Sequence, residues 1–348
     1  DIPKNRGRRM KPAPHRQSIR LIFGIAVTGF FVWLILRSVE MENLVQALSQ
    51  ARPGWIAAAL GFLLAGYACR ITRWRIMLRH DNPDIGWMIC AVPYMGSIAA
   101  NNVLPFRAGD ALRALAFSGW LGVPTPAIIA TLLVERLLDL ISLLIALGLV
   151  LLIFDLGSGA SGALVGLSGT GLIGIGLAVM AMLLFPQMVK PLVQLLLQLV
   201  SGLSAGLGLR LRGMSDKIFG TLRHLARGPR MALLVMWSAA VWTLEGAVFW
   251  ASAQAIPSLS APLAAWLALP VGTLSTLLPS TPGYIGTFHF FVIKAMEVLQ
   301  NPPVAAAAFA VLVHLVFWLP VTLIGSSCLA YWVLVRRPSS NFPIQKEP

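Results

Sequence analysis

The sequence predicts an all-α, polytopic membrane protein with six to eight transmembrane helices, including two re-entrant or broken segments. Hydrophobic residues make up 57% of the 348 residues and charged residues 11%, whereas a soluble domain carries about 25% charged residues. The mean hydropathy is +0.78. Several apolar runs approach the ~20 residues that a bilayer crossing needs.

The formal net charge of +14 does not indicate a nucleic-acid-binding protein. The basic residues lie in short clusters beside the apolar runs and not on one polar domain. Such clusters set membrane topology and contact anionic lipids. Cys69, Cys90 and Cys328 show no metal-ligand spacing, so we expect small core residues, no metal site and no cofactor.

The first half of the chain contains a basic arm and three apolar segments. Residues 1–20 form the arm, which we expect in the cytoplasm, and 21–36 form the first span. Residues 55–69 form the second span, and the arginines that follow return the chain to the cytoplasm. Residues 86–104 are apolar but contain Pro93 and two asparagines. They predict a broken or re-entrant segment.

The second half alternates long apolar runs with a basic region. We expect spans at 124–154, 171–185, 231–254 and 304–335, and amphipathic cytoplasmic helices at about 186–230. The domain organisation is therefore a basic arm at 1–20, a transmembrane domain at 21–335 and a polar tail at 336–348. Both ends are expected on the cytoplasmic side of a bacterial inner membrane.

The most informative segment runs from Asn101 to Arg113, with the sequence NNVLPFRAGDALR. Two asparagines, two arginines and an aspartate follow an apolar run directly, and such groups are costly at membrane depth unless they pair or hold a ligand. Pro105 and Gly109 indicate an irregular backbone, which needs protein or a water-filled cavity around it. The segment is our first candidate site.

A second irregular segment, LPSTPGYIGTF at 278–288, lies in a stretch without charged residues. Pro279 and Gly283 have the same spacing as Pro105 and Gly109. The basic clusters place the two segments near opposite membrane faces, so we predict an inverted repeat. The alternative is chance recurrence among 23 prolines and 31 glycines.

Three ordered motifs resemble the lysylphosphatidylglycerol synthetase transmembrane family. They are Asn-x-x-Leu-Pro-x-Arg-x-Gly-Asp-x-x-Arg from Asn101, Glu-Arg-x-x-Asp from Glu135 and Pro-x-x-Pro-Gly-x-x-Gly-Thr from Pro279. The resemblance implies a flippase-like domain that moves lipid between leaflets, here as a stand-alone member without an aminoacyltransferase domain. One departure is His289, where many members carry a glutamate.

The candidate substrate-binding side chains share a polar character within or beside apolar segments. They are Asn101, Asn102, Arg107, Asp110, Arg113, Glu135, Arg136, Asp139, Glu245 and Thr281. The residues expected to shape the backbone are Pro105, Gly109, Pro279, Pro282, Gly283 and Gly286.

Each of these roles has a structural alternative. Arg107 and Arg113 could bind a headgroup phosphate, and Asn101 and Asn102 could form neutral hydrogen bonds to headgroup oxygens. Glu135, Arg136 and Asp139 either serve this headgroup site or form an internal ion-pair network. Asp110 either contacts the headgroup or caps a helix that begins at Ala111.

We therefore predict a translocase for an anionic phospholipid or a lipid-linked headgroup, acting through a cavity between the two broken segments. The alternatives are a membrane-embedded lipid-modifying transferase and a lipid-binding scaffold for envelope biogenesis. We expect no enzyme activity and no nucleic-acid partner. The expected partners are membrane lipids, a second copy of the chain or a lipid-synthesising enzyme.

Overall fold

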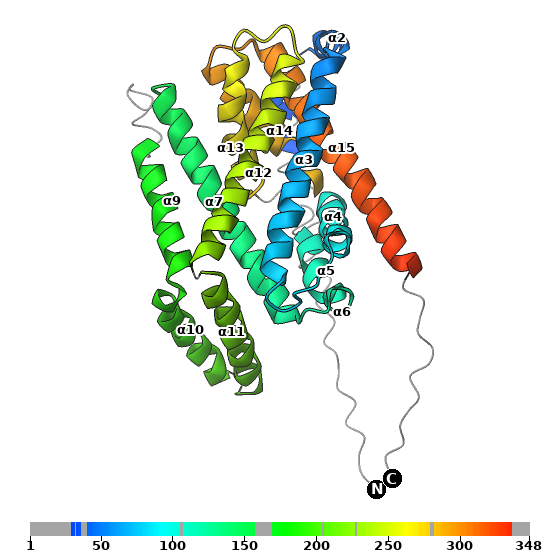
Figure 1. Ribbon diagram of the computed structural model, residues 1–348. Helices are drawn as coiled ribbons and strands as arrows, with labels where there is room; N and C mark the ends of the chain where they lie inside the picture. Colours follow the sequence, from blue (N-terminus) through cyan, green and yellow to red (C-terminus); the bar gives the residue numbers. More distant parts are fainter. Residues whose placement is uncertain are drawn as a thin grey trace, which may run out of the picture.

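A computed structural model describes residues 29–31, 33–35, 40–104, 107–156, 169–203, 205–226, 228–278 and 282–335. All regular elements of this part are helices (Figure 1). Their bounds are α2 Met41–Ser49, α3 Pro53–Leu78, α4 Trp87–Val103, α5 Ala108–Ala116, α6 Ser118–Leu121, α7 Thr125–Ile153, α9 Gly169–Leu184, η2 Pro186–Met188, α10 Lys190–Leu203, α11 Ala205–Leu225, α12 Pro229–Gln254, η3 Pro262–Ala264, α13 Ala265–Ser275, η4 Pro282–Tyr284, α14 Thr287–Val298 and α15 Pro303–Val335.

The predicted fold class, an all-α polytopic membrane protein, is confirmed. Four described helices, α3, α7, α12 and α15, are long and apolar enough to cross a membrane, and α9 is a shorter apolar helix. Most of the predicted span at 21–36 and all of the arm at 1–20 lie outside the described residues. The same holds for the tail at 336–348.

The long helices begin where proline favours a helix start. Pro53, Pro229 and Pro303 are the first residues of α3, α12 and α15, and proline is well tolerated there because its missing N–H would have no partner in the first turn. The helix of the predicted second span is longer than its apolar part. α3 continues past Cys69 to Leu78, and Arg70 and Arg73 on this continuation pair with acids inside the protein.

Each irregular segment is part of a hairpin of two helices. α4 is followed by the short return helix α5, and α13 by α14. Gly109 lies where α5 meets α4: an added Cβ would collide with the Ser97 carbonyl oxygen and the Asn101 side chain. In the second hairpin Gly283 has φ 76° and Gly286 has φ 86°, a left-handed conformation that glycine adopts readily.

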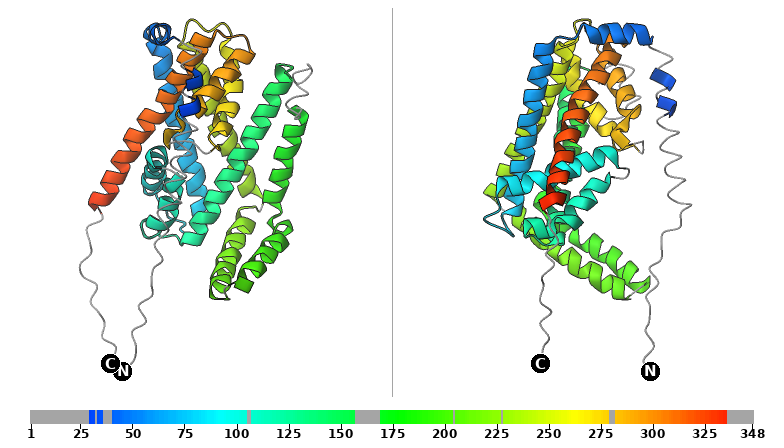
Figure 2. Two further views of the ribbon diagram at one scale, coloured as in Figure 1. Left: turned by 180° about the vertical axis from the view of Figure 1, so that it is seen from behind. Right: turned by 90° about the vertical axis from the view of Figure 1, so that its right-hand side faces the viewer.

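The two hairpins lie in two halves with the same element order. Each half has a long helix, a hairpin and a second long helix, namely α3, α4–α5 and α7, then α12, α13–α14 and α15. Figures 1 and 2 show the two hairpins toward opposite ends of the bundle. This arrangement agrees with the predicted inverted repeat.

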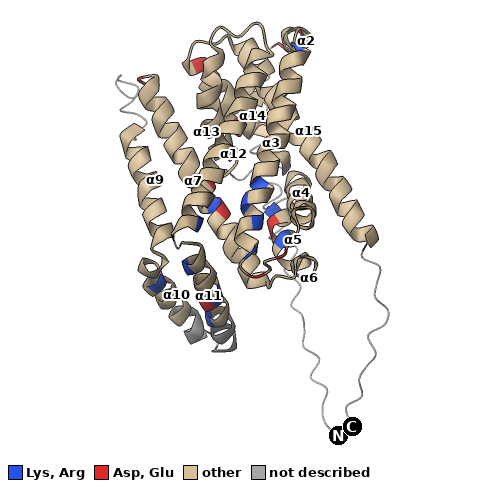
Figure 3. Cartoon of the chain, viewed as in Figure 1, with Lys and Arg blue, Asp and Glu red and all other residues tan. Residues whose placement is uncertain are grey.

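The halves pack closely along glycines. On α15, a Cβ at Gly325 would collide with the Met95 carbonyl of α4 and lie 2.6 Å from the Ala99 Cβ. Small residues at such crossings let helix backbones approach in a membrane. α10 and α11 project as a pair, and most Lys and Arg positions, coloured blue in Figure 3, lie in the half of the bundle that carries this pair.

Candidate functional site

A cluster of eight charged side chains lies in the interior, where α3, α5, α7 and α12 meet. Four are arginines and four are acids, so the formal charge of the cluster is balanced. The members are Arg70, Arg73, Asp110, Arg113, Glu135, Arg136, Asp139 and Glu245. Six of them are predicted site residues.

Arg113 and Glu135 form the most deeply buried pair, with side chains 0% and 1% exposed. The guanidinium donates to both carboxylate oxygens at 3.2 and 3.3 Å. It also lies over the rings of Trp74 and Tyr94, at 4.9 and 4.6 Å from their centres. Both terminal nitrogens of Arg113 are thus paired with Glu135, although its buried Nε–H has no acceptor among the described residues. This pairing agrees with the ion-pair alternative for Glu135.

Asp110 joins the α4–α5 hairpin to α7. Its carboxylate accepts hydrogen bonds from Arg136 at 3.0 and 3.1 Å and from the Asn101 amide at 3.0 Å. Burial raises the pKa of the Asp110 carboxyl, but Arg136 and Arg113 more than offset this and hold it below its ordinary value. Asp110 does not cap α5, because the N-cap residue is Arg107 and Asp110 lies in the first turn.

The third part of the cluster links α3, α7 and α12. Asp139 pairs with Arg73 at 2.9 Å and with Arg70 at 3.6 Å. Arg70 also pairs with Glu245, and Arg73 donates to the Ser238 hydroxyl at 2.8 Å. Glu245 is the only acid within its predicted span, yet it is not isolated. Its partner Arg70 lies 175 positions earlier in the chain.

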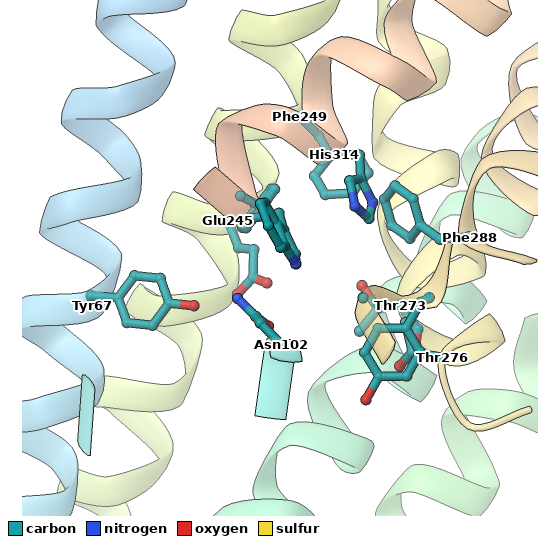
Figure 4. A pocket seen from close by; sticks show the side chains of 12 residues that line it. Tyr67, Asn102, Glu245, Phe249, Thr273, Thr276, Phe288 and His314 are labelled. Carbon is teal, nitrogen blue, oxygen red and sulfur yellow. The ribbon is translucent and has the colours of Figure 1, made fainter. Parts of the chain in front are cut away.

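Beside the cluster lies a cavity of about 180 Å³ that both irregular segments help to form. Figure 4 shows Tyr67, Glu245 and Asn102 on one side and the threonines and His314 on the other. Its described lining is Tyr67, Asn102, Glu245, Phe249, Thr273, Thr276, Gly283, Tyr284, Phe288, His314, Phe317 and Trp318. The predicted meeting of the two segments at a cavity therefore appears in the structure.

Only part of the predicted set lines this cavity. Asn102, Glu245 and Gly283 do, and the Asn102 amide also donates to Thr322 at 2.9 Å. Asn101 and the other six charged candidates do not. Those six are Arg107, Asp110, Arg113, Glu135, Arg136 and Asp139.

Three predicted positions, Pro105, Pro279 and Thr281, lie outside the described residues. Pro282 begins η4. Gly286 is the N-cap of α14 and, with His289, lines a separate cavity of about 150 Å³.

Arg107 differs from the clustered arginines. It begins the return helix with φ 51°, a left-handed conformation that is unfavourable for a residue with a side chain. Its side chain is partly exposed. Among the described residues it has no ion pair.

Sequence reasoning missed several lining residues. Tyr67, Thr273, Thr276 and Trp318 were not on the predicted list, although Thr273 and Thr276 are three residues apart and share a helix face at the end of an apolar run. Within the described part of the chain, no three His, Cys, Asp or Glu side chains converge as a metal ion would require.

Two comparisons bear on identity. Glycosyltransferase AglD of Haloferax volcanii is 26% identical over 333 residues, which cover 86% of this chain and 52% of that protein. The chain thus spans about half the length of this curated relative. The expectation that the chain is not an enzyme is contradicted by this comparison, since the relative is named a glycosyltransferase.

The second comparison is with protein families. The family model described as the lysylphosphatidylglycerol synthase TM region matches residues 21–325. This match covers most of the chain, including both hairpins, the charged cluster and the cavity between them. The chain belongs to the lysylphosphatidylglycerol synthase TM family.

Proposed function

We propose that this membrane domain binds the polar head of a lipid-linked sugar in the cavity and moves that head between the leaflets. The observation that carries the proposal is a polar cavity formed by both broken segments inside an apolar helix bundle. A polar head cannot cross hydrocarbon without compensating contacts. The cavity offers such contacts, while the hydrocarbon chain stays in lipid.

The lining favours a sugar over a bare phosphate. It offers hydroxyl groups from Tyr67, Thr273 and Thr276, an amide from Asn102 and several aromatic faces, groups that suit a ligand with many hydroxyls. The single carboxylate, from Glu245, accepts hydrogen bonds from hydroxyls and repels a phosphate. Among the lining residues there is no lysine or arginine.

Arg107 is the candidate contact for the phosphate that joins a sugar to its lipid chain. It starts α5 five residues after the cavity residue Asn102, and the described residues leave its charge without an ion pair. Guanidinium groups bind phosphate through two parallel hydrogen bonds. A left-handed, non-glycine residue held in place against its preference is typical of functional sites.

The proposed setting is a bacterial inner membrane with both termini in the cytoplasm. The support is that most Lys and Arg positions lie in the half of the bundle that carries α10 and α11 (Figure 3), since cytoplasmic segments are rich in these residues.

The test uses the purified chain in vesicles that contain a fluorescent polyprenyl-phosphoryl hexose or fluorescent phosphatidylglycerol. Leaflet exchange is measured by adding a quencher that reaches only the outer leaflet. We expect exchange of the hexose lipid above protein-free vesicles and little exchange of phosphatidylglycerol. Equal, background-level rates for both lipids would overturn the proposal.

Three variants sharpen this test. Glu245→Gln removes the cavity carboxylate but leaves Arg70 beside Asp139 at 3.6 Å, and Arg107→Gly removes the guanidinium while relaxing the left-handed backbone. We expect both to slow exchange about tenfold or more, since hydrogen bonds to charged groups contribute ~1.5–3 kcal/mol. Glu297→Gln, in the surface pair with Lys294, is the matched control and should exchange normally.

A second candidate function is sugar transfer to a membrane lipid, which the name of the Haloferax volcanii relative favours. The same vesicles, supplied with nucleotide-linked sugars and a polyprenyl phosphate, test it by mass spectrometry of the extracted lipid. A glycosylated product that requires the chain would support transfer.

A further inference from the structure

A second, larger cavity of about 650 Å³ lies along α7, α12 and α13. Its size falls in the range of ligand sites, roughly 300–1,000 Å³. Its lining is mostly apolar and comprises Leu138, Ile141, Ser142, Ile145, Ala146, Leu149, Val150, Ile153, Phe154, Met180, Val235, Ser238, Ala239, Trp242, Thr243, Leu263, Trp266 and Leu269. We call this the lateral groove.

The serine hydroxyls of the lateral groove are not free to bind a polar ligand. Ser142 donates to the Leu138 carbonyl and Ser238 to the Leu234 carbonyl, each at 2.8 Å. Ser238 also accepts from Arg73. The groove therefore fits an apolar occupant.

Other polar groups in the lining include the hydroxyl of the exposed Thr243 and the indole N–H of Trp242. The Trp242 side chain is buried, with the residue 8% exposed, and its indole N–H has no acceptor among the described residues. A buried donor without a partner is costly. Because the nitrogen atom itself is buried, a ligand in the groove contacts the indole ring and not its N–H.

The lateral groove continues toward the polar cavity along one helix face. Ser238, Trp242, Glu245 and Phe249 follow one another at intervals of four, three and four residues on α12, which places them on one stripe. The first two line the groove and the last two line the polar cavity. Arg70 spans the junction, since it pairs with Glu245 and lies over the Trp242 ring at 5.3 Å.

We infer that the lateral groove holds the hydrocarbon chain of the lipid whose head enters the polar cavity. This inference rests on the proposed function. It adds a second subsite on α7 and α12. The domain would then select its lipid by the hydrocarbon chain as well as by the polar head.

The experiment uses a polyprenyl-phosphoryl hexose that carries a diazirine midway along its hydrocarbon chain. The vesicles contain the full-length protein. After illumination, labelled peptides are identified by mass spectrometry. We expect labels on the groove faces of α7 and α12. Ala146→Phe fills the groove and should reduce this labelling about tenfold, whereas Ala178→Phe, an exposed position on α9 outside the groove lining, should not.

If the labels spread over the lipid-facing surface and do not change in Ala146→Phe, while leaflet exchange continues, the groove does not bind the hydrocarbon chain. The proposed function would still stand. Absence of both labelling and exchange in the unsubstituted chain would overturn both.

Discussion

Removing the Glu135 carboxylate should strongly destabilise the protein. Glu135→Gln leaves the Arg113 guanidinium, 0% exposed, with Asp110 at 3.8 Å as its remaining acid. Breaking a buried pair by removing one partner costs about 3–5 kcal/mol, because the other charge stays buried without compensation. We expect the free energy of unfolding to fall by that amount.

A double variant tests whether the loss of stability comes from an unpaired buried charge or from the loss of the ion pair itself. Arg113→Met with Glu135→Leu replaces both charges by apolar groups, and Asp110 keeps Arg136 and Asn101 as partners. Such replacements are often neutral or stabilising by about 1–4 kcal/mol. The double variant should therefore be more stable than Glu135→Gln alone.

The assay is denaturant unfolding of the purified protein in detergent, followed by tryptophan fluorescence. Glu297→Gln is the control, because its partner Lys294 is 52% exposed and exposed pairs contribute about 0–1 kcal/mol. A loss below about 1 kcal/mol for Glu135→Gln would refute the reasoning from burial. If leaflet exchange then vanished in a stable Glu135→Gln protein, the headgroup role would replace the ion-pair network.

Two further predictions concern the α4–α5 hairpin. Gly109→Ala should destabilise the protein by about 1–3 kcal/mol in the same assay, because its Cβ would collide with the Ser97 carbonyl. The control Gly119→Ala, which has open space around it, should change the stability little. Equal effects of the two substitutions would contradict this packing. The second prediction concerns the Asp110 carboxyl, whose pKa is lowered in the folded protein. Its contribution to the free energy of unfolding should be complete above the ordinary pKa of about 3.9. It should be lost as the pH falls through the lower pKa of the folded state. Asp110→Asn should reduce the stability at pH 7 and weaken its pH dependence below about 4, and thermal unfolding of both proteins from pH 7 to pH 3 checks this.

Much of the fold could be predicted because it depends on local patterns. The apolar runs locate α7, α9, α12 and α15 to within about three residues of their observed bounds. Proline and glycine spacing predicts both hairpins. These signals come from neighbouring residues and need no knowledge of partners.

The ion-pair partners could not be predicted in the same way. The acids of α7 were expected to need partners, but Arg70 and Arg73 belong to an arginine cluster that was interpreted only as a sign of cytoplasmic topology. Two members of that cluster point inward because α3 passes beside α7 and α12. Nothing near Arg70 in sequence distinguishes it from a surface arginine.

The cavity residues were missed for a related reason. Thr273, Thr276 and Tyr67 are unremarkable in apolar helices when taken singly, and only the meeting of α3, α4, α12 and α13 makes them one surface. The lateral groove has no signal in the sequence at all, since its lining looks like that of any lipid-facing helix.

The balance of four arginines against four acids has a consequence for how the chain enters the membrane. A charge at the centre of an inserting helix costs about 2.5–3.5 kcal/mol, and α3 carries Arg70 and Arg73 before any acid of the cluster has been synthesised. Arg73 gains its partner 66 residues later and Arg70 gains Glu245 only 175 residues later. We therefore expect α3 to need a polar or protein-lined environment until α7 is made, and a chain that lacks α12 would leave Arg70 with Asp139 as its remaining acid.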